Sequence, residues 1–166
     1  MTASATDVRP DNRAIPRRVF EEIFNQGRLE VADEIVATTF TLHSPMREEP
    51  FKGREEFKGF VTSLKQGFPD LTIVIDETIG DGDFVAIRSH VTGTHLGTYR
   101  GIPPTHRRIH QTQIHMFEVS DGHVQETWQE IDGLGVMQQL GVFPSGDPPR
   151  LLMRLVVGVQ RLFRRG

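Results

Sequence analysis

The chain has 166 residues, which is enough for one domain with a substantial interior. It has no cysteine, and this excludes disulfide bonds, a thiolate nucleophile and a cysteine-ligated zinc site. The segment from Pro148 to Gly166 carries five arginines and no acidic residue, so residues 1–147 hold 14 basic against 22 acidic residues, a net charge of −8. A body this acidic repels phosphate backbones, so we expect no nucleic-acid partner.

The N-terminal segment gives no sign of export or membrane insertion. It lacks the charged start and apolar core of a signal peptide, and no stretch of the chain reaches the ~20 apolar residues of a membrane span. We therefore expect a soluble, cytoplasmic protein. Residues 1–11 are polar and contain Pro10, so they are expected to form a flexible arm.

Three segments with helical periodicity come next. Apolar side chains recur at helical spacing in residues 13–27 and, on a shorter scale, in residues 29–40. In residues 53–69 the pattern is most regular and ends at Gly67 and Pro69. The sequence therefore predicts three N-terminal helices.

From Leu71 onward the period changes to two, which indicates strands. The predicted strands are residues 71–76, 83–95, 108–119 and 123–131, with a loop rich in glycine and proline before the third. Asp121-Gly122 joins the last two, and this dipeptide favours a tight hairpin because both central positions of a type I′ turn need positive φ. Helices followed by an antiparallel meander predict an α+β domain in which the helices cover one face of a curved sheet.

The hairpin also predicts which side chains share a face of the sheet. If the loop is the two residues Asp121-Gly122, Val119 faces Val124, Phe117 faces Glu126 and His115 faces Trp128. One face is then apolar near the turn and polar farther away, where it carries Gln111, Gln113, His115, Trp128, Glu130 and Asp132. Either this polar end faces solvent, or a bulge shifts the register, or the helices leave a ligand pocket above it. The register alone does not separate these alternatives.

Several short motifs in a fixed order resemble the SnoaL-like polyketide cyclases, often called ester cyclases. They include a Phe-Pro-Asp-Leu start, an arginine on the second strand, Gly-Thr-His, Gly-Ile-Pro-Pro-Thr, a tryptophan on the last strand, an aspartate four residues later and a closing Gln-Leu-Gly. The match runs from about residue 12 to 144. The resemblance implies a cone-shaped fold shared with ketosteroid isomerase and nuclear transport factor two, with a deep cavity between helices and sheet.

The resemblance also implies a reaction and a set of site residues. Family members of known activity close a polyketide ring by an intramolecular aldol step without a cofactor, with one aspartate as acid and base. That aspartate corresponds to Asp132, whose protonated form burial beside Glu130 would favour, and His115 is expected to hold the proton network or steady the enolate. The remaining substrate-binding candidates are Trp128, Gln111, Gln113, Glu130, His43, Arg88 and His90.

Several of these residues have a simpler alternative. His43 is equally consistent with a surface histidine, Arg88 with an ion pair to an acidic residue, and His95 with a structural role in its turn. His106 and His110 lie four residues apart on an extended segment, a spacing of ~13 Å that is too long for a shared metal. We expect no metal and no cofactor.

The expected layout is an arm (residues 1–11), a cyclase domain (12–144), a linker (145–149) and a basic amphipathic helix (150–166). That helix is expected either to pack on the protein, in a homodimer, or to lie at an anionic membrane surface. The expected function is cofactor-independent acid–base catalysis on a small hydrophobic carbonyl compound, as polyketide-type ring closure. The alternatives are a double-bond isomerase, an epoxide hydrolase and a non-catalytic module that binds a small ligand.

Overall fold

The computed structural model describes residues 12–145, which form helices and one curved sheet. The helices are α1 (Ala14–Arg18), the π-helix η1 (Val19–Asn25), α2 (Val31–Ile35), α3 (Arg54–Gly67) and α4 (Gly133–Gln139). The strands are β1 (Val36–His43), β2 (Phe51–Lys52), β3 (Thr72–Asp81), β4 (Phe84–Thr94), β5 (Arg108–Ser120) and β6 (His123–Ile131). The predicted basic helix at residues 150–166 and most of the predicted linker lie outside the described residues.

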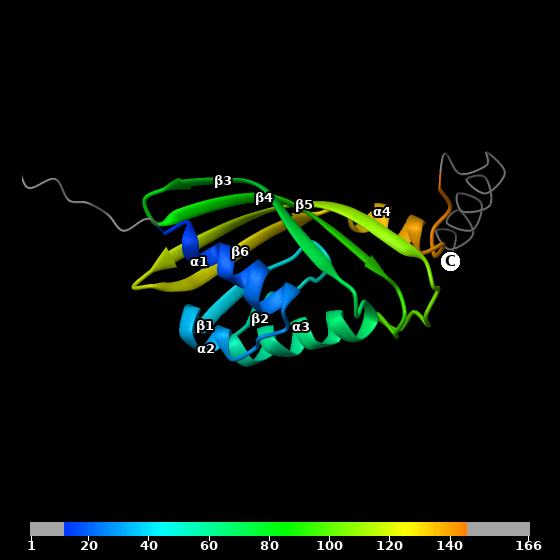
Figure 1. Ribbon diagram of the computed structural model, residues 1–166, viewed down its shortest axis with the longest axis horizontal. Coiled ribbons are helices and arrows are strands. Elements are labelled where there is room, and N and C mark those ends of the chain that lie inside the picture. Colours follow the sequence, from blue (N-terminus) through cyan, green and yellow to red (C-terminus); the bar gives the residue numbers. More distant parts are fainter. Residues whose placement is uncertain (1–11, 146–166) are drawn as a thin grey trace, which may run out of the picture.

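The six strands form a single sheet in the order β2-β1-β6-β5-β4-β3. All neighbours pair antiparallel except β1 and β6, which run parallel. The helices α1, α2 and α3 lie along one face of this sheet, as Figure 1 shows. The predicted α+β cone with N-terminal helices on a curved, mainly antiparallel sheet is therefore confirmed. In the part of the chain from residue 12 to 145, no helix is long and apolar enough to cross a lipid bilayer.

Two N-terminal predictions need correction. The segment at residues 29–40 was expected to be one helix, but α2 ends at Ile35 and β1 begins at Val36. The β-branched and aromatic residues from Val36 to Phe40 favour an extended strand, and pairing with β6 overrides the helical spacing. In addition, α1 continues as a π-helix, a form that is rare and is frequently found at functional sites.

The hydrophobic core fills the space between the helices and the covered face of the sheet. The π-helix contributes Phe20 and Ile23, which are at most 2% exposed. The ring of Phe20 packs edge-on against Phe117 of β5 at 5.7 Å between ring centroids. The strand residues that meet them include Val36, Val85, Ile87, Val119 and Val124, all of them fully buried.

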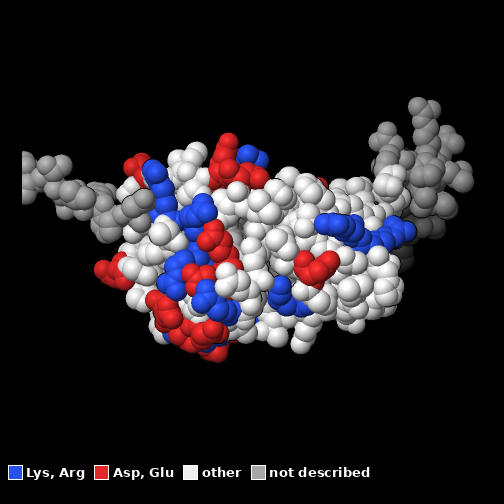
Figure 2. Space-filling model, viewed as in Figure 1, with Lys and Arg blue, Asp and Glu red and all other residues white. Residues whose placement is uncertain are grey.

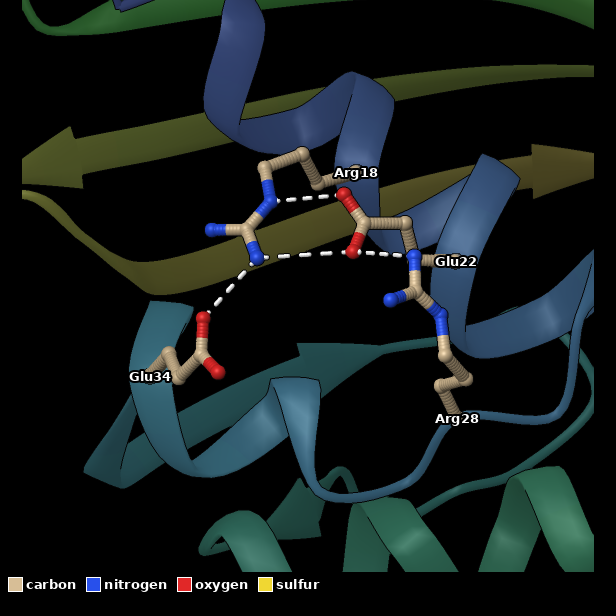
Figure 3. A network of polar contacts seen from close by, with 4 residues as sticks. All are labelled: Arg18, Glu22, Arg28 and Glu34. Carbon is tan, nitrogen blue, oxygen red and sulfur yellow. Dashed lines mark hydrogen bonds and ion pairs between the residues drawn. The ribbon is translucent and has the colours of Figure 1, made fainter.

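Charged residues fasten the N-terminal helices to each other at the surface. Arg18 contacts both Glu22 of η1 and Glu34 of α2, at 2.7 and 2.9 Å, and Arg28 contacts Glu22 at 2.7 Å (Figure 3). These hydrogen bonds raise the pKa of Arg18 and lower the pKa of Glu22. Basic and acidic side chains are correspondingly intermixed over α1 and α2 in Figure 2.

The hairpin between β5 and β6 has the predicted turn but not the predicted register. Asp121 and Gly122 both have positive φ, at 50° and 74°, and Ser120 faces His123. Beyond Val119 and Val124, however, Gln125 is an extra residue on β6, and it forms a β-bulge. From that point Phe117 faces Thr127 and His115 faces Gln129. The predicted pairs of Phe117 with Glu126, His115 with Trp128 and Gln113 with Glu130 are therefore wrong.

Candidate active site

A cavity of about 70 Å³ lies between the helices and the sheet. A second hollow of about 20 Å³ lies closer to the hairpin. Three phenylalanines (Phe20, Phe24 and Phe60), His115 and Gln129 line both hollows. The larger cavity is otherwise lined by Leu64, Phe68, Leu71, Ile73, Val91, Tyr99, Ile109, Gln111, Gln113, Ile131 and Val136. His115 thus lies where the two hollows meet.

His115 projects from β5 into this apolar interior and is only 6% exposed. The ring of Phe20 packs edge-on against it at 5.1 Å, and Phe117 stacks beside it at 5.7 Å. This burial lowers the pKa of His115 to about 4, because the charged imidazolium loses its hydration. The imidazole is therefore neutral at pH 7 and has one nitrogen with a free lone pair.

The polar groups beside His115 are amides and hydroxyls. His115 Nε2 lies 3.1 Å from Gln129 Oε1, and Gln129 Nε2 donates a hydrogen bond to Ser44 Oγ at 2.6 Å. On β5, Gln113 Nε2 donates to the buried Ser89 Oγ at 3.0 Å. Among the described residues, none that lines either hollow is Asp or Glu. The site can therefore bind neutral carbonyl groups. Its titratable side chains are His115, which contacts Gln129, and Tyr99, whose pKa is raised by burial.

Of the residues predicted from the sequence, Gln111, Gln113 and His115 line the cavity together. Trp128 and Glu130 do not, because the bulge at Gln125 turns them to the other face of β6. There they line an open surface groove of about 220 Å³ together with His43. The predicted single cavity containing Gln111, His115, Trp128 and Asp132 is therefore wrong.

His43 belongs to the outer face as well. Its Nε2 lies 2.5 Å from Glu126 Oε1, and its ring stacks on Trp128 at 5.5 Å between centroids. Because β1 pairs parallel with β6, His43 lies directly opposite Trp128. Its geometry therefore fits the simpler alternative, a partnered surface histidine.

Asp132 is exposed and caps the helix that follows β6. Its Oδ1 accepts a hydrogen bond of 2.8 Å from the backbone N–H of Gly135, which is the usual contact of an N-cap residue. A side chain at position 135 would collide with this carboxylate, because a Cβ there would lie 2.0 Å from Asp132 Oδ2. Asp132 lines neither hollow, and its position gives a structural reason for the residue. The acid–base role that the resemblance implied for it is untested, and the proposal below assigns the chemistry to His115 instead.

Arg88 and His90 also lie outside the cavity, on the outer face of β4. Arg88 pairs with Asp76 and Glu77 at 3.1 and 3.2 Å, and His90 Nδ1 lies 2.9 Å from Asp76 Oδ1. Arg88 therefore fits the simpler alternative, an ion pair with an acidic residue. Within residues 12–145, no group of three or more His, Asp or Glu side chains has the arrangement of a metal site.

Gln129, Ser44 and the phenylalanine wall are the site residues that the sequence analysis missed. The sequence does indicate Gln129. The apolar Ile131 lies two residues further along the strand, so it shares a face with Gln129 rather than with Trp128. Ser44 had no such signal, because it reaches the site only through the pairing of β1 with β6, and β1 was predicted as helix. Phe20 and Phe24 were placed on the first helix, but their position under His115 depends on the helix packing.

Comparison with known proteins gives one consistent picture. A family model described as SnoaL-like polyketide cyclase matches residues 14–140. The aklanonic acid methyl ester cyclase DauD of Streptomyces sp. (strain C5) is 30% identical over 124 residues, which cover 72% of this chain and 76% of that protein. The nogalonic acid methyl ester cyclase of Streptomyces nogalater is 26% identical over 119 residues, which cover 71% of this chain and 89% of that protein.

Solved structures agree with these relatives. A SnoaL-like protein of Jannaschia sp. CCS1 superposes with a TM-score of 0.74 at 26% identity, covering 86% of this chain and all of that one. IdmH of Streptomyces antibioticus superposes with a TM-score of 0.69 at 29% identity, covering 79% of this chain and 99% of that one.

Proposed function

The chain belongs to the SnoaL-like polyketide cyclase family, an enzyme family, and we propose that it closes a carbon ring within a neutral polyketide ester at His115. The observation that carries this proposal is the buried, neutral imidazole of His115, which lines a cavity together with amides and aromatic rings. The named relatives act on methyl esters of aklanonic and nogalonic acid. Since the described lining contains no charged residue that would pair with a carboxylate, an ester suits this cavity better than a free acid.

The proposed step is an intramolecular aldol reaction. His115 Nδ1 takes the proton from a carbon that lies between two carbonyl groups, which leaves an enolate beside the imidazolium. The enolate carbon attacks a ketone carbon of the same molecule, one carbon–carbon bond forms, and the resulting alkoxide takes the proton back from the imidazolium. Atoms and electrons balance without a co-reactant, so the proposed reaction needs no cofactor.

The electrostatics of the cavity support a role for His115 as the base. A histidine with a pKa of about 4 is a weak base, so the substrate proton must be an acidic one, as it is between two carbonyls. Gln111 and Gln113 line the same cavity, and Gln113 Nε2 donates to Ser89 Oγ, so the amide of Gln111 is the group suited to stabilise the charge that develops on the enolate oxygen. The low polarity of the phenylalanine wall strengthens these interactions.

A multi-ring substrate requires the cavity to enlarge. A dry cavity of roughly 150 Å³ holds a single benzene ring, and the larger hollow has about 70 Å³. Phe20, Phe24 and Phe60 line both hollows, so rotation of these side chains would join the two spaces. We propose that substrate binding displaces them.

The test of the proposed function is product analysis. The purified chain is incubated with aklanonic acid methyl ester, and the product is examined by mass spectrometry and NMR. Ring closure gives a product of unchanged mass with a new carbon–carbon bond and a new carbinol carbon. A product of unchanged mass with only a shifted double bond would identify an isomerase, and the free acid, formed by uptake of water with release of methanol, would identify a hydrolase. Either result would overturn the proposal.

A further inference from the structure

The two ring nitrogens of His115 have different surroundings. Nε2 lies 3.1 Å from Gln129 Oε1, whereas Nδ1 is buried with no hydrogen-bond partner in the described part of the chain. A neutral imidazole carries one N–H, and a carbonyl oxygen only accepts, so the proton belongs on Nε2. The lone pair of Nδ1 is then the free basic site of the ring, and substrate reaches it when the side chains that cover it are displaced, as proposed above.

This arrangement depends on which end of the Gln129 amide faces His115. Gln129 Nε2 donates to Ser44 Oγ at 2.6 Å, and the backbone N–H of Met46 donates to the same oxygen at 3.3 Å. In this orientation the amide nitrogen donates to Ser44, whose hydroxyl oxygen also accepts from Met46, and the amide oxygen faces His115. If the amide turned over, its NH₂ group would face Nε2, and the stable tautomer of His115 would carry its proton on Nδ1 instead.

We propose that Ser44 and Gln129 are positioning residues that hold His115 in the tautomer with a free Nδ1 lone pair. This inference rests on the proposed function, in which that lone pair removes the substrate proton. Ser44 is 85 residues away from Gln129 in the chain, and the parallel pairing of His43 with Trp128 brings the two side chains together. Ser44 and Gln129 also line the surface groove. The contacts from His115 through Gln129 to Ser44 therefore end at the wall of that groove.

The direct test is the protonation of the two ring nitrogens, measured by ¹⁵N NMR of histidine-labelled protein at neutral pH. In the unmodified chain we expect His115 Nε2 to be protonated and Nδ1 unprotonated. Ser44→Ala releases the amide, so the protonated fraction should move toward Nδ1. The kcat for aklanonic acid methyl ester should fall about tenfold with little change in KM. The free energy of one ordinary hydrogen bond changes the ratio of the two His115 tautomers by about that factor. Ser44→Thr keeps the hydroxyl and should restore both readouts, while Ser63→Ala, on the exposed face of α3, should change neither.

Gln129→Glu provides a second variant that does not depend on how Ser44→Ala folds. A carboxylate also accepts from Nε2–H, so the tautomer should be kept while the added negative charge raises the pKa of His115. Unchanged nitrogen protonation in Ser44→Ala, or a protonated Nδ1 in the unmodified chain, would overturn the inference. If the tautomer shifts as expected but turnover does not change, the positioning stands and the proposed role of His115 fails.

Discussion

His115 combines two properties that have opposite effects on the protein. Its burial among Phe20 and Phe117 keeps the imidazole neutral, which the proposed reaction needs. The same burial makes protonation of the folded state unfavourable, so the residue should destabilise the protein in acid. The site residue is thus also a determinant of pH-dependent stability.

The free energy of unfolding should fall as the pH is lowered from about 6.5 toward 4. The pKa of His115 is about 4 in the folded protein and about 6.5 in the unfolded chain, so between these values the unfolded state binds the additional proton. Stability is therefore greatest above pH 6.5 and is lost as the pH drops, by roughly 3 kcal/mol for this group over the full interval. The fully buried His95, whose pKa is also lowered by burial, adds to the effect.

Urea denaturation at a series of pH values checks this prediction. The interval between pH 6.5 and 4.5 is the informative one, because most carboxylates titrate below it. His115→Gln should flatten the pH dependence in this interval, and His110→Gln, on the exposed outer face, is the matched control. Equal slopes for His115→Gln and the unmodified chain would show that the imidazole is not the cause.

Asp132 is expected to contribute to stability through its cap of α4. Asp132→Ala removes the acceptor for the Gly135 N–H and should lower the free energy of unfolding by ~1 kcal/mol. Asp132→Asn should keep most of the free energy of unfolding, because asparagine caps a helix about as well as aspartate. Denaturation midpoints of the two variants measure the difference, and equal losses in both would indicate that the charge matters rather than the cap.

At the scale of elements, the bulge at Gln125 decides which residues of β6 enter the site. The type I′ turn at Asp121-Gly122 could be predicted because both residues tolerate positive φ. An inserted residue has no comparable local signature, since Gln125 is an ordinary strand residue whose effect is to shift its neighbours by one position. Gln111, Gln113 and His115 were correctly assigned to one face because they lie on the unbulged strand, whereas Trp128, Glu130 and Asp132 were not.

Deletion of Gln125 should leave a regular hairpin with the pairs that the structure already shows, because Val119 with Val124 and Glu118 with Glu126 become consecutive pairs. Trp128, the only tryptophan of the chain, should therefore stay on the outer face, and its fluorescence emission should match that of the unmodified chain. Gln125→Ala keeps the extra residue and is the matched control. A blue-shifted emission of the deletion variant would show that Trp128 has moved into the interior, and it would contradict this register.

The strand β1 shows a second limit of sequence reasoning. Residues Leu29 to Val36 have helical spacing, and the local pattern does not reveal that the chain straightens at Val36 to pair with β6, which is nearly ninety residues away. This pairing is a tertiary contact between distant segments, so it overrides a local preference. Ser44 and the stacked His43 depend on it and could not be placed without it.

At the scale of the whole molecule, the outer face of the sheet carries exposed apolar side chains among charged ones. The apolar side chains are between 43% and 68% accessible and comprise Val74, Ile79, Phe84, Ile114 and Met116. Exposed apolar side chains on a sheet face are typical of a protein interface, and a face that pairs with its own copy favours a symmetric dimer. We therefore expect a homodimer that buries this face.

Ile114→Glu should weaken that association, because it replaces an apolar side chain of this face by a second carboxylate beside Glu130. Size-exclusion chromatography with light scattering should then give the mass of one chain for Ile114→Glu and of two for the unmodified protein. Leu134→Glu, at an equally exposed position on α4, is the matched control. A monomeric unmodified protein, or the same mass for both variants, would contradict the expected dimer.

The most direct test of the account is the kcat of two single variants in the cyclisation of aklanonic acid methyl ester, each verified to be folded by circular dichroism. His115→Asn removes the proposed acid–base group from the cavity and should lower kcat by ~10²–10⁴-fold. Asp132→Asn leaves a neutral cap on α4, outside the cavity, and should keep kcat near that of the unmodified chain. The reverse result, in which Asp132→Asn loses activity and His115→Asn retains it, would contradict the assignment of the chemistry to His115.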